Sequence, residues 1–175
     1  MAVGVPVPLT AARVDLGGDD FKLILNWPFS DPYVHRLLSS DIPQRVRFNS
    51  GRIWIFRDSR GQPVGFGTID VCDDYRQYTG GKMHPYIPLL AVNPTIQSLG
   101  YGTSILNYLI SEAALIAQEF ENCHDVLFLD VYVSNLKAIS LYERAGFERL
   151  SLTPFDDSIE GAKYLVMGRR VSRAT

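Results

Sequence analysis

Apolar runs of strand length recur along the chain and are separated by turn-forming residues. Continuous or alternating apolar residues over about four to eight positions are typical of β-strands. On this pattern we expect strands at Phe21–Leu25, Ile53–Arg57, Val64–Val71, Tyr86–Val92, Val126–Val133, Phe147–Leu152 and Lys163–Val171. The run Tyr86–Val92 is nearly all apolar, which indicates a strand buried on both faces.

After the strand predicted at Tyr86–Val92, the spacing of apolar residues changes to that of a helix. From Gly102 onward, apolar residues recur at steps of three and four, the spacing of an amphipathic helix. The residues of this stripe are Ile105, Leu106, Leu109, Ile110, Ala113, Ala114, Ala117 and Phe120. A second helix is predicted over Asn135–Ala145, with Asn135 suited to its N-terminus and Gly146 to its C-terminal cap. A short helix is predicted over Tyr33–Ser40, stopped before Pro43. Strands flanking helices predict a mixed α/β (α+β) domain.

Length and composition are those of one ordinary globular domain. The chain has 175 residues, of which 46% are hydrophobic and 21% charged, so we expect a single domain over 1–175. Residues 1–20 are expected at its periphery, as a surface segment or an edge strand, and Asp73–Pro85 as an exposed loop. The net charge is −2, and no basic patch indicates nucleic acid.

Neither the cysteines nor the apolar segments indicate secretion or a membrane. Cys72 and Cys123 are too few for a disulfide framework and are expected as free thiols in a reducing compartment. The start of the chain, MAVGVPVPL, lacks a charged segment and contains two prolines, unlike a secretory signal. No apolar run approaches the roughly 20 residues that span a bilayer. We therefore expect a cytoplasmic protein without a membrane partner and without a metal.

The segment Gln97–Gly102 is a candidate site because it lies between a predicted strand and a predicted helix. A helix start leaves backbone N–H groups unpaired and carries the positive end of the helix dipole. Gly100 and Gly102 let the backbone approach an oxyanion closely, and the hydroxyl groups of Ser98, Thr103 and Ser104 add further donors. The segment therefore predicts an anion site that needs no charged side chain.

The surrounding sequence supports an anion but excludes the two common nucleotide loops. Residues 75–111 contain no Asp or Glu, whereas an even spread of the 19 acidic residues would place about four there. A Walker loop needs Ser or Thr after its Gly-Lys pair, but Gly81-Lys82 continues with Met83. A dinucleotide-binding loop needs a third glycine where Ile105 stands.

The predicted helix Asn135–Ala145 carries a second pattern. Seven positions, or two helical turns, separate Asn135 from Tyr142, so both are expected on one face, with the small Ala138 near them. A polar group, a small residue and a phenol in line suit a long, thin ligand. Taken alone, this helix is better explained as an ordinary amphipathic helix with a core tyrosine.

Together, the two segments resemble the GNAT superfamily of N-acetyltransferases. The cofactor loop of the family is Gln or Arg, two residues, Gly, one residue, then Gly or Ala; here it is Gln97, Gly100 and Gly102, preceded by LLAVNP. The second signature of the family corresponds here to Asn135, Ala138, Leu141-Tyr142 and Gly146-Phe147. The order and spacing of the two motifs, and the strand predicted between them, agree with the family pattern over roughly residues 53–171.

The resemblance implies a central mixed, mostly antiparallel sheet with helices on both faces. The sheet is expected to splay where the strands at Tyr86–Val92 and Val126–Val133 part, and acetyl-coenzyme A (acetyl-CoA) is expected to enter there. The implied cofactor-binding residues are Leu90, Ala91, Val92, Gln97, Ser98, Leu99, Gly100, Tyr101, Gly102, Thr103, Asn135, Ala138 and Tyr142. Many relatives have basic residues in the loop; here it is uncharged, so pyrophosphate binding would depend on backbone donors.

The implied reaction is N-acetylation by direct attack of an amine on the thioester. A backbone N–H near Val92 is expected to stabilise the oxyanion, and Tyr142, a phenol with an ordinary pKa of about 10, to protonate the leaving thiolate. The general base is undetermined between His84 and Tyr86, although an exposed loop histidine explains His84 more simply. Asp70, Asp73, Asp74 and a water chain stay open as further candidates.

The acceptor is a small-molecule or protein amine that the fold does not name, and the length of the acyl group also stays open. Its expected neighbours are Trp27, Phe29, Tyr33, His35 and the loop Tyr75–Tyr86, which is also a candidate homodimer contact. One alternative is a toxin-type acetyltransferase that acts on aminoacyl-tRNA, against which the lack of a basic patch argues. The other is a non-catalytic coenzyme A-binding regulatory module.

Overall fold

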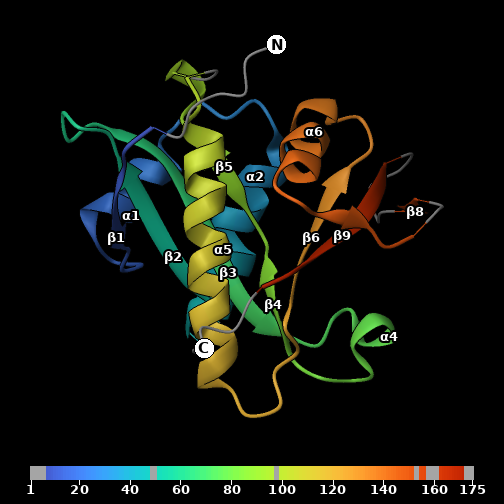
Figure 1. Cartoon of the computed structure of the whole chain (residues 1–175). Coiled ribbons are helices and arrows are strands. Elements are labelled where there is room, and N and C mark those ends of the chain that lie inside the picture. Colours follow the sequence, from blue (N-terminus) through green and yellow to red (C-terminus); the bar gives the residue numbers. More distant parts are fainter. Residues whose placement is uncertain (1–6, 48–50, 97–98, 152–153, 157–161, 172–175) are drawn as a thin grey trace. The chain divides into compact units, whose positions relative to one another are not determined.

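The computed structural model describes residues 7–47, 51–96, 99–151, 154–156 and 162–171 (Figure 1). The chain divides into two compact units, Met1–Asp70 with Pro88–Leu109 and Val71–Ile87 with Ile110–Thr175. The described residues form helices and mostly antiparallel strands with a parallel pair, so the expected fold class is confirmed. Within these residues, no helix is both long and apolar enough to cross a membrane.

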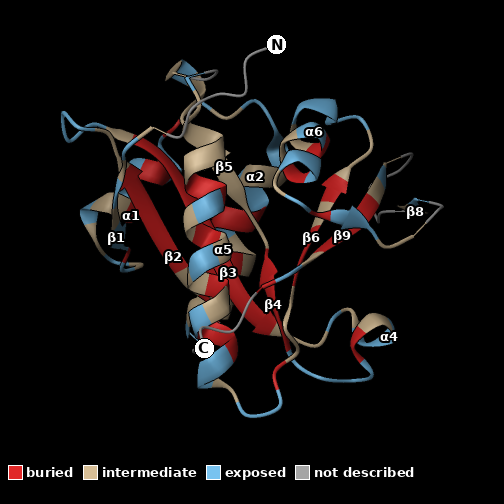
Figure 2. Cartoon of the chain, in the orientation of Figure 1, coloured by how far each residue is buried: buried red, intermediate tan, exposed pale blue. Residues whose placement is uncertain are grey.

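The first unit contains an antiparallel sheet. Its strands are β1 (Thr10–Arg13), β2 (Arg52–Arg57), β3 (Pro63–Cys72) and β5 (Leu90–Val92). They pair in the order β1-β2-β3-β5. The predicted strands at residues 53–57 and 64–71 are confirmed, and so is an edge strand within residues 1–20. Figure 2 shows that β2 and β3 are buried along most of their length.

Alternate side chains of this sheet face two helical layers. One layer consists of α1 (Asp19–Leu25), α2 (Pro32–Arg36), the π-helical turn η1 (Leu37–Asp41) and α3 (Ile42–Arg47). Ile53, Ile55 and Phe66 pack into one buried cluster with residues of this layer. On the other face, Tyr108 of α5 (Tyr101–Glu119) contacts the rings of Trp54 and Phe56. The sheet of this unit therefore has helices on both faces.

The predictions at the N-terminal helices were wrong in two places. Residues 21–25 are helical, because Asp19 and Asp20 favour a helix start and Phe21 and Ile24, three positions apart, are both buried. The helix predicted from Tyr33 does not stop at Pro43, which is the second residue of α3. A proline near the start of a helix lacks an N–H group that would be unpaired there in any case.

Gly65 and Gly67 of β3 allow α5 to pack closely against the sheet. A Cβ atom at Gly65 would lie 2.4 Å from Cδ1 of Ile105 and 2.8 Å from the carbonyl oxygen of Ala91. At Gly67 it would lie 2.6 Å from Cδ1 of Leu109. The clash at Gly65 includes a backbone atom of the neighbouring strand, whereas the clash at Gly67 involves only a flexible side chain.

We expect Gly65→Ala to destabilise the protein more than Gly67→Ala. The carbonyl group of Ala91 cannot move without disturbing the pairing of β3 with β5, but Leu109 can change its side-chain conformation. Overpacking of a core typically costs about 1–3 kcal/mol, and we expect G65A to lie in this range and G67A below it. Urea unfolding would measure both, and equal midpoints would contradict the argument.

The second unit contains a sheet of both parallel and antiparallel strands. Its strands are β4 (His84–Ile87), β6 (Val126–Tyr132), β7 (Glu148–Arg149), β8 (Phe155–Asp156) and β9 (Lys163–Arg170). β4 pairs with β6 in parallel, and β9 pairs in antiparallel fashion with β6, β7 and β8. The helices named in this unit are α4 (Arg76–Thr79) and α6 (Leu136–Arg144).

The run Tyr86–Val92 is two strands rather than one. β4 ends at Ile87 and pairs with β6, whereas β5 begins at Leu90 and pairs with β3. Between them lies Pro88, which has no N–H group to donate to a strand ladder. β5 is half-buried, so the prediction of a strand buried on both faces holds only for β4.

Candidate functional site

The glycine segment ends in the first turn of α5, within the first unit. Gly100 has φ of 85°, a left-handed conformation that favours glycine, and the helix begins at Tyr101. The amides of Thr103 and Ser104 already donate to the carbonyl oxygen of Gly100, at 3.1 and 3.3 Å. Among the described residues, no acceptor is recorded for the amides of Tyr101 and Gly102, which makes these two amides the candidates for binding a ligand.

The remaining residues of the predicted loop differ in their surroundings. Gln97 and Ser98 lie outside the described residues. Leu99 is 58% exposed. The hydroxyl oxygen of Ser104 accepts a hydrogen bond from the amide of Val7 at 2.8 Å, so this side chain is already engaged. Of the two described side chains that were expected to donate a hydroxyl group to an anion, Thr103 is thus the better candidate.

The backbone of β5 offers hydrogen-bonding groups on the edge that faces away from β3. The amide of Thr68 donates to the oxygen of Leu89 at 2.9 Å, and the amide of Asn93 donates to Val64 at 2.8 Å. Hydrogen-bonded and non-bonded pairs alternate in an antiparallel ladder, which places the backbone groups of Ala91 toward β3. Those of Leu90 and Val92 point the other way.

This geometry separates the three predicted residues of β5. β5 pairs with β3 alone among the described strands, so the outward groups of Leu90 and Val92 form a strand edge. Such an edge can bind an extended ligand as an added strand would be bound. Leu90 and Val92 are therefore better suited than Ala91 to hold a ligand by the backbone.

In the second unit, Asn135 caps helix α6. Its side-chain oxygen accepts a hydrogen bond from the amide of Ala138 at 3.1 Å, as predicted for an N-cap. Asn135 has φ −87° and ψ 65°, outside the helical region, and it is exposed, whereas Tyr142 is buried. The helical phase does not extend to a cap residue, so the two side chains do not share one face as expected.

Tyr142 lies in an environment that keeps its phenol protonated. The side chain is 8% exposed and its ring packs against Phe147, with ring centroids 5.9 Å apart. Burial, and secondly the negative charge of Asp130, raise the pKa of Tyr142 to about 12. At neutral pH the residue is therefore an O–H donor.

Asp130 was missed by the sequence analysis. It lies on β6, is half-buried, and its carboxylate accepts a hydrogen bond from the hydroxyl of Tyr86 at 2.8 Å. The same carboxylate raises the pKa of Tyr142 and, after burial, that of Tyr75. One carboxylate thus acts on three phenols of this unit. The signal in the sequence was the single charge in the apolar run LFLDV.

Neither of the two predicted base residues has the expected surroundings. His84 is fully buried in β4 rather than exposed in a loop, and burial lowers its pKa. Its Nδ1 faces the carbonyl oxygen of Lys82 at 3.4 Å and its Nε2 faces the thiol of Cys72 at 3.6 Å. Tyr86 is a donor to Asp130, which makes Asp130, and not Tyr86, the group that can receive a proton.

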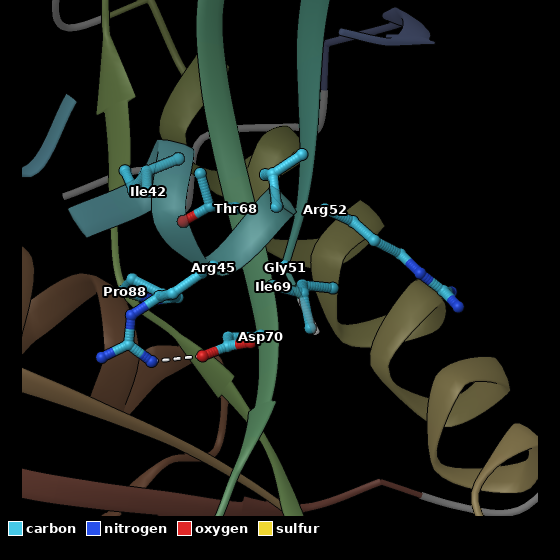
Figure 3. A pocket seen from close by; sticks show the side chains of 9 residues that line it. Ile42, Arg45, Gly51, Arg52, Thr68, Ile69, Asp70 and Pro88 are labelled. Carbon is cyan, nitrogen blue, oxygen red and sulfur yellow. Dashed lines mark hydrogen bonds and ion pairs between the residues drawn. The ribbon is translucent and has the colours of Figure 1, made fainter. Parts of the chain in front are cut away.

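Two of the other carboxylates considered as bases, Asp70 and Asp73, are engaged in ion pairs. Asp70, at the buried end of β3, is paired with Arg45, and both line a small pocket of the first unit (Figure 3). Asp73 is paired with Arg76 on the surface. These pairs favour structural roles for both carboxylates.

The aromatic residues expected near an acceptor are divided between core and surface. Trp27 is 6% exposed, and its ring contacts Phe29 and Phe66, so it fills the core of the first unit. In the second unit, the rings of Tyr75 and Tyr78 stack on Phe128, at centroid distances of 5.5 and 6.3 Å. Tyr75 and Tyr78 are half-buried and thus remain candidates for contact with a ligand.

The comparisons with known proteins agree with this picture. The Acetyltransferase (GNAT) family model matches residues 19–147, whereas no curated protein matches the sequence. Among solved structures, spermidine N-acetyltransferase from Vibrio cholerae in complex with CoA and spermine has a TM-score of 0.68 at 20% identity, over 94% of this chain and 96% of that one.

Two further structures extend the likeness to other organisms. A GNAT-family acetyltransferase from Bacillus cereus has a TM-score of 0.66 at 16% identity, over 95% of this chain and 99% of that one. Arabidopsis thaliana NAA60 in complex with a bisubstrate analogue has a TM-score of 0.66 at 15% identity, over 95% of this chain and 100% of that one. At these identities the structures show the fold, and the family model covers most of the chain. The chain belongs to the acetyltransferase (GNAT) family and is an acyltransferase of the N-acetyltransferase type.

Proposed function

We propose that this protein transfers an acetyl group from acetyl-CoA to a primary amine by direct attack of the amine on the thioester. The observation that carries the proposal is the placement of Asp130. It accepts a hydrogen bond from Tyr86 and raises the pKa of Tyr142, so a proton acceptor and a proton donor lie within electrostatic reach of each other.

Donors of the first unit bind the cosubstrate. The outward backbone groups of Leu90 and Val92 hold the pantetheine arm, and the N–H group of Val92 is the candidate donor to the oxyanion. The amides of Tyr101 and Gly102, at the positive end of the 19-residue helix α5, hold the pyrophosphate. The charge-free loop supports this assignment, as it places no carboxylate near the phosphates.

Residues of the second unit bind the pantetheine arm and move the protons. Asn135 and Ala138 stay predicted contacts of the arm. Asp130 takes a proton from the ammonium group of the acceptor, and the neutral nitrogen attacks the thioester carbonyl. As the C–S bond breaks, the phenol of Tyr142 gives its proton to the thiolate, and the second proton that the attacking nitrogen must lose passes through solvent water to restore the phenol. Protonation of Asp130 removes one of the two causes that raise the pKa of Tyr142, so the acid becomes stronger when its proton is needed.

The acceptor is an amine of a small molecule or a protein. One structural neighbour is a spermidine N-acetyltransferase bound to spermine, and another neighbour is NAA60 bound to a bisubstrate analogue. The half-buried rings of Tyr75 and Tyr78 beside an acidic group favour a cationic acceptor, because aromatic faces and carboxylates both attract ammonium groups. A homodimer and a cytoplasmic location stay predictions.

A thiol-release assay with acetyl-CoA and a panel of amines tests this function. The panel contains polyamines, a lysine peptide, peptides with free N-termini and an aminoacyl-tRNA. We expect release of coenzyme A with at least one acceptor and a raised melting temperature on adding coenzyme A alone. Binding of coenzyme A without turnover on any acceptor would favour the regulatory module. Turnover only on aminoacyl-tRNA would favour the toxin-type enzyme. A melting temperature that coenzyme A does not change would reject the enzyme and the regulatory module alike.

A further inference from the structure

Thr68 is a buried polar side chain at the point where β5 joins the sheet of the first unit. It is 2% exposed and lies on β3, whose other interior residues are apolar, glycine or Asp70. Buried hydroxyl groups are normally hydrogen-bonded. The partner of Thr68 is therefore informative.

Three hydrogen bonds join Thr68 to one residue, Leu89. Its hydroxyl oxygen accepts from the amide of Leu89 at 3.0 Å and donates to the carbonyl oxygen of Leu89 at 3.1 Å. The amide of Thr68 donates to the same carbonyl at 2.9 Å. Both backbone groups of Leu89 are thus held by a single residue of β3.

Leu89 lies in the break between the two strands. Pro88, which has no N–H group, and Leu89 separate β4 from β5, and Pro88 lines the same small pocket as Thr68 (Figure 3). A hydroxyl group can be donor and acceptor at once. The hydroxyl group of Thr68 therefore acts as both donor and acceptor for Leu89, just before the regular pairing of β5 with β3 begins at Leu90.

The next residues of β5 take their orientation from this contact. β5 has only three residues and pairs with β3 from Gly67↔Leu90 to Gly65↔Val92. A one-residue slip of such a short strand would turn every backbone group to the opposite edge. Leu89 is the residue that precedes the strand, so fixing it fixes which groups point outward.

We infer that Thr68 is a positioning residue for the cosubstrate strand: by holding Leu89, its hydroxyl group keeps the backbone groups of Leu90 and Val92 directed away from β3, toward acetyl-CoA. The inference rests on the proposed function, because it assigns those outward groups to acetyl-CoA. Thr68 itself contacts neither cosubstrate nor acceptor in this scheme.

Three variants test this role. Thr68→Val keeps the shape but removes the hydroxyl group, and Thr68→Ser keeps the hydroxyl group. Ile53→Val weakens the buried cluster against which Leu89 packs but leaves the hydroxyl group of Thr68 in place. Calorimetry measures the Kd of coenzyme A, and steady-state kinetics measures KM for acetyl-CoA and for the amine. We expect T68V to raise the Kd of coenzyme A and the KM for acetyl-CoA about tenfold. The reason is that the amide of Leu89 loses its hydrogen-bond partner, so β5 is no longer held in the orientation that binds the cosubstrate.

The pattern across variants separates positioning from stability. T68S should stay within about threefold of the wild type, I53V should bind normally, and the KM of the amine should change little in all three. Coenzyme A binding by T68V as tight as by the wild type would overturn the inference, and so would equal losses in T68V and I53V, or no rescue by serine. If T68V does not fold, Thr68→Cys, with its weak hydrogen-bonding thiol, takes its place under the same criteria.

The wild-type titration distinguishes this inference from the proposed function. If the wild-type protein does not bind coenzyme A, the proposed function fails and the role of Thr68 fails with it. If the wild type binds and turns over but the Thr68 variants behave like it, only the role of Thr68 is rejected.

Discussion

Replacing Tyr142 by phenylalanine is expected to lower kcat about 100-fold or more, the usual contribution of a general acid. The ring is buried against Phe147, and phenylalanine preserves this packing. The Kd of coenzyme A should therefore change by less than about threefold. Steady-state kinetics with acetyl-CoA and calorimetry with coenzyme A measure the two quantities on the same preparation.

Tyr108→Phe is a matched control for this experiment. It also removes one phenolic hydroxyl from an aromatic cluster, in this case beside Trp54 and Phe56, and it should leave kcat nearly unchanged. Equal kcat values for Y142F and the wild type would remove Tyr142 from the mechanism. Because the pKa of Tyr142 is raised to about 12, its ionisation should not limit the rate below about pH 11.

The raised pKa also predicts how stability depends on pH. An unfolded tyrosine has a pKa of about 10, so folding keeps a proton that the unfolded chain loses first. This stabilisation is fully present below about pH 10 and is lost as the pH rises from 10 through 12. The stability of Y142F should fall less steeply over this range in alkaline urea titrations.

Asp130→Asn is expected to lower kcat/KM about 100-fold or more, because an amide cannot take the proton of the acceptor ammonium. It should also lower the pKa of Tyr142 from about 12, since one of its two causes is removed while burial remains. Titration of tyrosinate absorbance in D130N and in D130N/Y142F isolates Tyr142 by difference. An unchanged rate would reject Asp130 as the base.

Asp125→Asn controls for the loss of a negative charge from the same unit. The carboxylate of Asp125 is 38% exposed and lies 3.7 Å from both His124 and Arg170. This variant should keep the wild-type rate and the pKa of Tyr142. Equal losses of activity in D125N and D130N would indicate a general electrostatic effect rather than proton transfer by Asp130.

Local sequence determined the elements whose side chains repeat with a clear period. The stripe from Ile105 to Ala117 predicted α5, and the cap and turn residues Asn135 and Gly146 predicted the ends of α6. The ordered pair of motifs in these segments predicted the family. These signals are readable because helix period, capping and glycine conformation depend on neighbours within a few positions of the chain.

Other features depended on partners far away in the sequence, and only the tertiary structure decided them. Thr68 meets Leu89 across 21 positions and Tyr86 meets Asp130 across 44 positions. No local pattern states whether His84 is buried, and Pro88 by itself does not tell that β4 and β5 pair with different strands. Burial and strand pairing are set by the elements that pack around these residues. The sequence alone thus determined the family and the helices α5 and α6. The fold determined the partners of the reactive groups, since hydrogen bonds and desolvation act through space.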